Sequence, residues 1–344
     1  MDWREIVFLS TKKRGLNPDL KLVKNYLFEK IENVSFKYFT SSEKAENQWA
    51  RVGIKSAKKE YCKKLQDTIC IDGSLPIKLP ASAGEGHKIL ISTPYDYQFK
   101  AMNELAGNPS RKKKKTFFKC TDVIVGSPFG KELFEKCYQL QKANIVEEVC
   151  CPVAYEITQE ESIQNIRKKF AKYFPQILNK KVLAIMVTGA LDESQENPFA
   201  NFDWRAFLKG LGDEWFVLTN DENLMENAIR LRSKYKESLG YVNQMLDARE
   251  MIYFADCLIT NSSMYAAYFS TKRKPLYVIP YKDNEFVCYA EREFSDIFVS
   301  DVNKISELPI KEETVTDSHQ RFFDYFSYKP IRHPGDVIVD ILNN

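Results

Sequence analysis

Strand-length apolar runs alternate with helix-length amphipathic segments along this chain, and that alternation constrains the fold more than any other feature. In the first half, the predicted strands are residues 3–10, 34–39, 68–71, 89–92 and 121–125. Helices are predicted at residues 19–31, 57–65 and 131–139, and residues 41–45 can cap a further helical stretch. Strands that alternate with helices are typical of a parallel sheet covered on both faces.

The same alternation begins again in the second half of the chain. Its predicted strands are residues 181–187, 215–218, 257–259 and 275–279. Its predicted helices are residues 162–173, 204–211 and 264–269, and a further helix lies within residues 242–254. A loop is expected from the last strand through Pro309, followed by helices at 318–326 and 336–342. We therefore expect two tandem doubly wound α/β domains, residues 1–152 and 153–317, with C-terminal helices (318–344) that pack back across them.

Composition indicates a soluble globular protein. Of the 344 residues, 44% are hydrophobic and 28% are charged, which excludes a disordered or collagen-like chain. The longest apolar run, residues 181–187, is far shorter than the ~18 residues of a spanning helix. The charged start, Met1-Asp2-Trp3-Arg4, does not resemble a signal peptide. A cytoplasmic location is expected, with peripheral attachment to the inner face of the membrane left open.

Metal-ligand spacing is absent. The chain has 8 cysteines and 3 histidines, and no Cys-x-x-Cys pair occurs. Most cysteines lie in apolar segments, so we expect buried, reduced thiols, with Cys150-Cys151 ending a strand. The sequence predicts neither a metal site nor a cofactor.

Charge is distributed unevenly. Residues 1–150 carry 27 basic and 18 acidic residues, a net of +9, whereas residues 151–344 carry 23 and 29, a net of −6. The densest basic run is Arg111, Lys112, Lys113, Lys114 and Lys115, and Phe117-Phe118 follow it. Such a run suits an anionic polymer or a membrane surface, or it is simply a solvated loop. Nucleic acid is the least favoured partner, because no groove-reading motif accompanies the charge.

Polar residues stand at three strand-to-loop junctions: Thr93 after the fourth strand, Ser127 after the fifth, and Thr260-Asn261-Ser262-Ser263 before a helix. Ligands of doubly wound sheets bind at the carboxyl ends of the strands. The third junction gathers hydroxyls and backbone N–H groups where a helix begins, which suits a phosphate group. Alternatively, Asn261 or Ser262 only caps that helix.

Glycine-rich nucleotide motifs are missing. Neither Gly-x-Gly-x-x-Gly nor a Walker loop occurs in the sequence. Nicotinamide-dependent oxidoreductases and P-loop kinases are therefore disfavoured.

Several segments, in order, resemble the CDP-glycerol glycerophosphotransferase family, whose GT-B-fold enzymes make teichoic-acid-like poly(alcohol phosphate) chains. The matching segments are residues 6–10, 17–18, 22–27, 71–76, 89–94, 122–129, 256–263 and 274–276. The similarity is strongest around residues 254–281, where Asp256-Cys257-Leu258-Ile259-Thr260-Asn261-Ser262-Ser263 resembles the family signature Asp-x-Leu-Ile-Thr-Asp-Tyr-Ser-Ser.

The resemblance implies a GT-B-like fold, with two Rossmann-like domains facing across a cleft. It also implies that Thr260, Asn261, Ser262 and Ser263 contact the phosphates of a nucleotide-activated donor, CDP-glycerol or a nucleotide sugar. Thr93, Ser127 and Asn220 would line the cleft. The acceptor would be an anionic polymer or a lipid-linked chain, met by the basic run Arg111–Lys115.

Both family histidines are missing here. Matching Thr93-Pro94 to the family's Trp-His-Gly-Thr-Pro motif puts Ile91 at the histidine, and the second histidine falls near Asn220. Isoleucine cannot accept a proton. Asp96, just past Thr93-Pro94, is our candidate general base, and His319 and His333 in the C-terminal tail stay open as replacements.

Two functions from different classes are compatible with these features. The first is a transferase that moves glycerol phosphate, a related alcohol phosphate or a sugar from a nucleotide donor to a cell-envelope acceptor. The second is a catalytically inactive member that keeps the nucleotide site for binding or scaffolding. The extent of the matching motifs favours the first, and the missing histidines favour the second.

Overall fold

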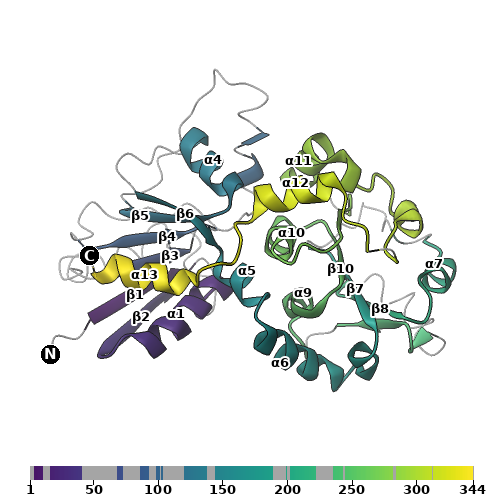
Figure 1. Ribbon diagram of the computed structural model, residues 1–344, viewed down its shortest axis with the longest axis horizontal. Coiled ribbons are helices and arrows are strands. Elements are labelled where there is room, and N and C mark those ends of the chain that lie inside the picture. Colours follow the sequence, from purple (N-terminus) through teal and green to yellow (C-terminus); the bar gives the residue numbers. More distant parts are fainter. Residues whose placement is uncertain are drawn as a thin grey trace. The chain divides into compact units, whose positions relative to one another are not determined.

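A computed structural model gives the arrangement of the chain (Figure 1). It describes residues 4–10, 16–40, 68–72, 86–92, 98–100, 102–103, 120–137, 144–188, 199, 202–221, 235–242, 245–281, 284–311 and 313–343. The chain forms two compact units. Unit 1 contains Met1–Tyr155 and Tyr325–Asn344, and unit 2 contains Glu156–Asp324.

Unit 1 is built on a six-stranded parallel sheet. Its strands are β1 (Arg4–Ser10), β2 (Val34–Thr40), β3 (Thr68–Asp72), β4 (Lys88–Ile91), β5 (Asp122–Gly126) and β6 (Asn144–Cys150). Their order in the sheet is β2-β1-β3-β4-β5-β6. All five pairings are parallel, so the carboxyl ends of these strands share one edge.

Helices cover this sheet. They are α1 (Pro18–Lys30), α4 (Pro128–Cys137), α5 (Pro152–Glu156) and the last helix of the chain, α13 (Pro334–Asn343). Asn17 caps α1 by accepting a 2.7 Å hydrogen bond from the Leu20 N–H, and Pro18 follows at the first helical position. The helices α1 and α13 lie side by side and share one apolar cluster with β1 and β4 (Figure 1).

Unit 2 is built on a five-stranded parallel sheet. Its strands are β7 (Lys181–Met186), β8 (Trp215–Thr219), β9 (Leu239–Tyr241), β10 (Cys257–Thr260) and β11 (Leu276–Val278). Their order is β11-β10-β7-β8-β9, and every pairing is parallel. From β7 the chain adds β8 and β9 toward one edge of the sheet. It then returns to the other side of β7 and adds β10 and β11 toward the opposite edge, which is the Rossmann arrangement.

Both faces of the second sheet are covered. Its α-helices are α6 (Glu160–Ala171), α7 (Trp204–Leu211), α9 (Met251–Phe254), α10 (Ser263–Ser270), α11 (Glu285–Glu293) and α12 (Asp317–Phe326), and its 3-10 helices are η3 (Pro175–Leu178), η4 (Ala248–Glu250), η5 (Ser295–Ile297) and η6 (Val302–Glu307). The helices α6, α9 and α10 follow one another along one side of the sheet, and α7 lies on the other side (Figure 1).

Side chains on both faces of β7 are buried. Leu183, Ile185 and Val187 point to one face and join an apolar cluster with α7. The residues between them are buried as well, because every residue of the strand after Lys181 is buried. A strand buried on both faces reads as a continuous apolar run, as residues 181–187 do.

One expected loop is wrong. The segment from the last strand through Pro309 contains α11, η5 and η6. The helix α11 begins where the Asn284 side chain accepts a 2.8 Å hydrogen bond from the Val287 N–H. That cap, with Glu285 in the first turn, is the local signal that the loop assignment overlooked. The sequence also does not predict the short strand β9. The helix expected at 57–65 and the cap expected at 41–45 lie outside the described residues.

The units divide after Tyr155 and again after Asp324, whereas the expected domains divided after residues 152 and 317. The first difference has a local cause. The Asp19 carboxylate, on α1, accepts a 2.9 Å hydrogen bond from the Val153 N–H, which attaches the start of α5 to unit 1. The second division falls inside α12, whose residue His319 packs against Tyr277 of β11.

Candidate functional site

The second sheet has a switch point at the carboxyl ends of β7 and β10. The chain leaves β7 toward β8 and β9, and later leaves β10 toward β11 in the opposite direction. Connections that diverge in this way leave a crevice beyond the carboxyl ends of the two central strands, which is where doubly wound sheets bind ligands.

Residues Thr260 to Ser263 stand at this switch point. Thr260 ends β10, and Ser262 occupies the N-cap position of α10 with extended backbone angles of φ −100° and ψ 120°. The Ser262 side chain makes no capping hydrogen bond. Within the described part of the chain, the hydroxyls of Ser262 and Ser263 have no hydrogen-bond partner, so they stand beside the first N–H groups of α10 as donors for an anion.

Two asparagine side chains hold the end of β7 from either side. The Asn220 amide, after β8, accepts from the Val187 N–H and donates to the Val187 carbonyl, each at 2.9 Å. The Asn261 amide, after β10, does the same to Thr188, at 2.8 and 3.0 Å. Asn220 and Asn261 thus lie at the carboxyl edge of the sheet, where the site was predicted. The oxygen and nitrogen atoms of their side chains, however, are hydrogen-bonded to the backbone and do not face a ligand.

Residues that the sequence did not single out complete this edge. Asn284, at the start of α11, donates a 2.9 Å hydrogen bond to the Asn261 carbonyl. The Tyr281 hydroxyl, which follows β11, donates a 2.9 Å hydrogen bond to the carboxylate of Asp221, which follows β8. Asp221 is only 3% exposed. Of these three residues, only Asn284 could have been identified from the sequence, because an Asn directly before a helical segment is a typical N-cap.

Ser127 is a buried helix cap in unit 1. It follows β5, and its hydroxyl accepts a 3.0 Å hydrogen bond from the Gly130 N–H at the start of α4. The preceding Gly126 has φ +71°, and a Cβ there would lie 2.4 Å from the Cys151 sulfur, so only glycine fits. Cys151 in turn donates to the Ser92 carbonyl at 3.1 Å.

The remaining predicted site residues lie outside the described part of the chain. They are Thr93, Asp96, Arg111, Lys112, Lys113, Lys114 and Lys115. Ile91, at the first family histidine position, is 2% exposed and belongs to the apolar core of unit 1.

The three histidines occupy three different settings. His87 lies just before β4, at the amino end of the strand, 3.7 Å from Asp122. His319 is 1% exposed and packs edge-on against Tyr277, and burial lowers its pKa. His333 stacks on Tyr26 at 3.7 Å between ring centroids, and burial lowers its pKa as well. Within unit 2, His319 contacts Thr316, Tyr277 and Phe323, none of which belongs to the β10–α10 junction.

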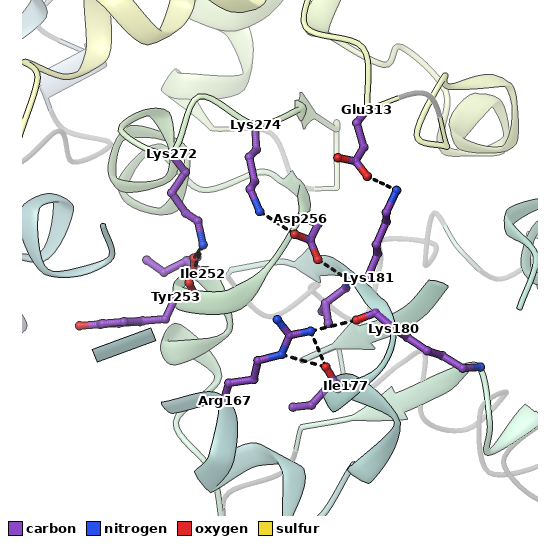
Figure 2. A network of polar contacts seen from close by, with 11 residues as sticks. Arg167, Ile177, Lys180, Lys181, Ile252, Tyr253, Asp256, Lys272, Lys274 and Glu313 are labelled. Carbon is purple, nitrogen blue, oxygen red and sulfur yellow. Dashed lines mark hydrogen bonds and ion pairs between the residues drawn. The ribbon is translucent and has the colours of Figure 1, made fainter. Parts of the chain in front are cut away.

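The opposite edge of the second sheet carries a network of paired charges (Figure 2). Asp256, just before β10, accepts from Lys274 at 2.5 Å and from the Val182 N–H at 2.9 Å. Lys181 pairs with Glu313. Lys272 donates to the Tyr253 and Ile252 carbonyls at the end of α9, at 2.5 and 3.3 Å. Asp256 and Glu313 are thus each paired with a lysine, whereas the Lys272 ammonium is held by backbone carbonyls.

Among the residues that the structure describes, no group of three or more His, Cys, Asp or Glu side chains could hold a metal ion. Within the described ranges, no helix is long and apolar enough to cross a membrane. None of the cysteines described there is in a disulfide: Cys70, Cys120, Cys150, Cys151 and Cys257 are buried, Cys137 is half-buried and Cys288 is exposed.

Comparison with solved structures shows the fold. The wall teichoic acid polymerase TagF superposes with a TM-score of 0.61 at 14% identity, over 98% of this chain and 88% of that one. The structure of S. aureus MnaA with UDP has a TM-score of 0.52 at 8% identity, over 98% and 95% of the two chains. The predicted α/β class of GT-B type, built on two Rossmann-like sheets, is confirmed.

Comparison of sequences shows the family. The teichoic acid poly(ribitol-phosphate) polymerase of Bacillus spizizenii is 21% identical over 289 residues, which are 82% of this chain. This chain spans about half of that relative, 46% of its length. The family model described as CDP-Glycerol:Poly(glycerophosphate) glycerophosphotransferase matches residues 1–287, and it confirms the resemblance read from the motifs. The chain is therefore a member of the CDP-glycerol:poly(glycerophosphate) glycerophosphotransferase family.

Proposed function

We propose that this chain is a transferase that moves glycerol phosphate, or a related alcohol phosphate or sugar, from a nucleotide-activated donor to a cell-envelope polymer. The family description names CDP-glycerol as donor and poly(glycerophosphate) as acceptor. The curated relative is a teichoic acid polymerase. Both favour an anionic polymer, free or lipid-linked, as the acceptor of this chain.

The observation that carries the proposal is the β10–α10 junction. Two serine hydroxyls and the first N–H groups of α10 lie together at the switch point of the second sheet. A nucleotide diphosphate brings two negative phosphates, and a helix N-terminus with adjacent hydroxyls binds them through dipole and hydrogen bonds. The donor phosphates would contact Ser262 and Ser263, with Thr260 and Asn261 behind them.

The chemistry asks little of the protein beyond positioning. The acceptor hydroxyl oxygen forms a bond to the phosphorus that carries glycerol, the bond from that phosphorus to CMP breaks, and a base takes the hydroxyl proton. Positioning and charge neutralisation supply most of the rate in such transfers. Asp96 is the proposed base because it follows Thr93-Pro94 in the sequence, five residues after β4 ends at Ile91.

Release of CMP tests the proposal directly. The protein is incubated with CDP-glycerol, with and without a poly(glycerophosphate) acceptor, and CMP is measured by chromatography. Nucleotide sugars are tested in parallel for release of a nucleoside diphosphate. Acceptor-dependent release that disappears in Asp96→Asn is the expected result. No release from any donor would contradict the transferase assignment.

A second function, nucleotide binding without transfer, is favoured by one observation. The positions of both family histidines hold residues that cannot move a proton here: Ile91 is in the core, and the Asn220 amide is bonded to Val187. A catalytically inactive member would be stabilised by CMP or CDP-glycerol in a thermal-shift assay while releasing no CMP.

The acceptor surface is proposed to lie in the basic first half. The net charge of +9 over residues 1–150 and the run Arg111–Lys115 would attract an anionic polymer or the anionic leaflet that carries it. Attachment there would place the protein at the inner face of the cell membrane.

A further inference from the structure

The side-chain amides of Asn220 and Asn261 each form hydrogen bonds to the backbone of one residue, in the same way as a residue of a neighbouring strand does. Each accepts from an N–H and donates to a C=O of a single residue, at 2.8–3.0 Å. That exchange of two hydrogen bonds is the pattern of a paired residue in an antiparallel ladder. The two amides therefore extend the hydrogen bonding of the sheet beyond the last residue of β7, on both sides of the switch point.

The Asn261 residue is itself held from three directions. Its side chain is bonded to Thr188, and its carbonyl accepts from Asn284 at 2.9 Å. The next residue, Ser262, donates its N–H to the Thr260 hydroxyl at 3.0 Å. Thr260 and Asn261 are fully buried. Since Asn261 directly precedes the N-cap of α10, these contacts set the direction in which the first N–H groups of α10 point.

An amide is the side chain that this arrangement requires. An Asp at either position can accept from the backbone N–H, but it cannot donate to the backbone carbonyl when ionised. Its second oxygen would then face a carbonyl oxygen at the 2.9–3.0 Å where the amide nitrogen now lies. An alanine would leave the same N–H and C=O groups without their present partner.

We propose that Asn220 and Asn261 are positioning residues, which hold the end of β7 and the start of α10 in the geometry that binds the donor diphosphate. This inference rests on the proposed function, and it gives the two asparagines a role other than direct contact with phosphate. Hydrogen-bond donors that are already held in place bind the charge of the diphosphate without reorganising. Loss of the Asn220 or Asn261 amide should therefore lower the affinity for the donor, although Ser262 and Ser263 remain.

The test compares Asn220→Ala and Asn261→Ala with wild type and with a matched control, Asn179→Ala. Asn179 is an exposed asparagine in the same unit, beyond η3, with no part in the junction. Calorimetry measures the affinity for CDP-glycerol, and hydrogen exchange measures protection of the Val187 and Thr188 amides. We expect at least a tenfold loss of affinity and faster exchange in both junction variants, and no change in the control.

Asn220→Asp and Asn261→Asp separate positioning from charge. If the aspartate variants bind weakly but the alanine variants bind as wild type does, repulsion of the donor explains the loss, and the inference is overturned. Equal binding by wild type and all folded variants also overturns it. A wild-type protein that binds no CDP-glycerol overturns the proposed donor function, and the inference with it. Circular dichroism confirms folding of each variant.

Discussion

Side chains at the β10–α10 junction divide between two tasks. Thr260 and Asn261 are bonded to the backbone around them, whereas the hydroxyls of Ser262 and Ser263 have no partner among the described residues. Thr260 and Asn261 shape the junction, and the hydroxyls of the two serines are left for a ligand. A hydrogen bond to a charged group is stronger than one between neutral groups, so the serines should carry a measurable share of donor affinity.

Replacing Ser262 and Ser263 together by alanine should weaken nucleotide binding by about 1–3 kcal/mol, because two donors to a charged phosphate are removed. Calorimetric titration with CMP and CDP-glycerol measures the change. Ser270→Ala is the control, since that serine is in the same helix and its hydroxyl donates to the Ala266 carbonyl at 2.8 Å. A double variant that binds as tightly as wild type would remove this junction as the phosphate site.

Lys272 makes the stability of unit 2 depend on pH. Its pKa is lowered from 10.5 to about 7, mainly by burial and then by the neighbouring Lys274, while Asp256 acts in the opposite direction. The folded state therefore binds fewer protons than the unfolded state between pH 7 and 10.5, and stability from this group rises with pH across that window. Below pH 7 both states carry the charge, and the full cost of burying it remains.

Lys272→Met should remove this contribution. We expect the free energy of unfolding of the variant, relative to wild type, to fall as pH rises from 7 to 10, by at most about 1.4 kcal/mol per pH unit. Denaturant titrations at several pH values measure it. Lys304→Met, at an exposed lysine of η6, should show a difference that does not vary with pH. A pH-independent difference for Lys272→Met would show that its ammonium is not desolvated.

At the scale of elements, the backbone of α13 at Gly335 lies close against the ring of Tyr26 on α1. A Cβ on Gly335, in the first turn of α13, would lie 2.2 Å from the Tyr26 ring and 2.9 Å from the His333 ring. Those rings are stacked on each other, and the Tyr26 hydroxyl donates to Asp336 at 2.5 Å. Burial raises the pKa of Tyr26 to about 12. The last helix is thus attached to unit 1 through a contact that only glycine allows.

Gly335→Ala should destabilise unit 1 by about 1–3 kcal/mol, the usual cost of overpacking, because neither ring can move away without losing its partner. The denaturation midpoint followed by tyrosine and tryptophan fluorescence measures it. Gly210→Ala is the matched control: that glycine is in α7, and a Cβ there meets nothing within 4 Å. Alanine at that helical position should be neutral or stabilising by up to about 1 kcal/mol. Equal midpoints for the two variants would contradict the close approach.

At the scale of the whole molecule, the dominant feature is the charge difference along the chain, +9 over residues 1–150 and −6 over residues 151–344. Each Lys or Arg near an anionic leaflet contributes about 1 kcal/mol, so the five residues of Arg111–Lys115 could hold the protein at a membrane surface. Such binding should weaken steeply with salt, because exposed charges are screened within about 10 Å at 0.1 M.

Changing Lys112, Lys113, Lys114 and Lys115 to Gln should abolish salt-dependent sedimentation with anionic liposomes, while nucleotide affinity is unchanged. The matched control changes four exposed lysines of unit 2, Lys168, Lys172, Lys304 and Lys311, by the same total charge. It should sediment like wild type. Sedimentation of the Lys112–Lys115 variant at wild-type level would show that another surface binds the membrane.

Much of the fold could be predicted because its signals are local. The continuous apolar run at 181–187 and the helical spacing at 204–211 predicted β7 and α7 near their observed bounds. The motif at residues 256–263 predicted the family, which the family model confirms. The helix α11 was missed although Asn284 is a local cap, since a capping residue is also common in loops.

The candidate site was predictable only in part, because its geometry depends on residues far apart in the chain. The sequence by itself determined that Thr260, Asn261, Ser262 and Ser263 stand between a strand and a helix, since four consecutive residues follow from local pattern. Only the tertiary structure decided their tasks. Asn220 meets Val187 across 33 residues and Asn261 meets Thr188 across 73. The order of the strands in the sheet places these partners side by side. The local sequence pattern does not indicate which amide is hydrogen-bonded to the backbone or which hydroxyl stays available to a ligand.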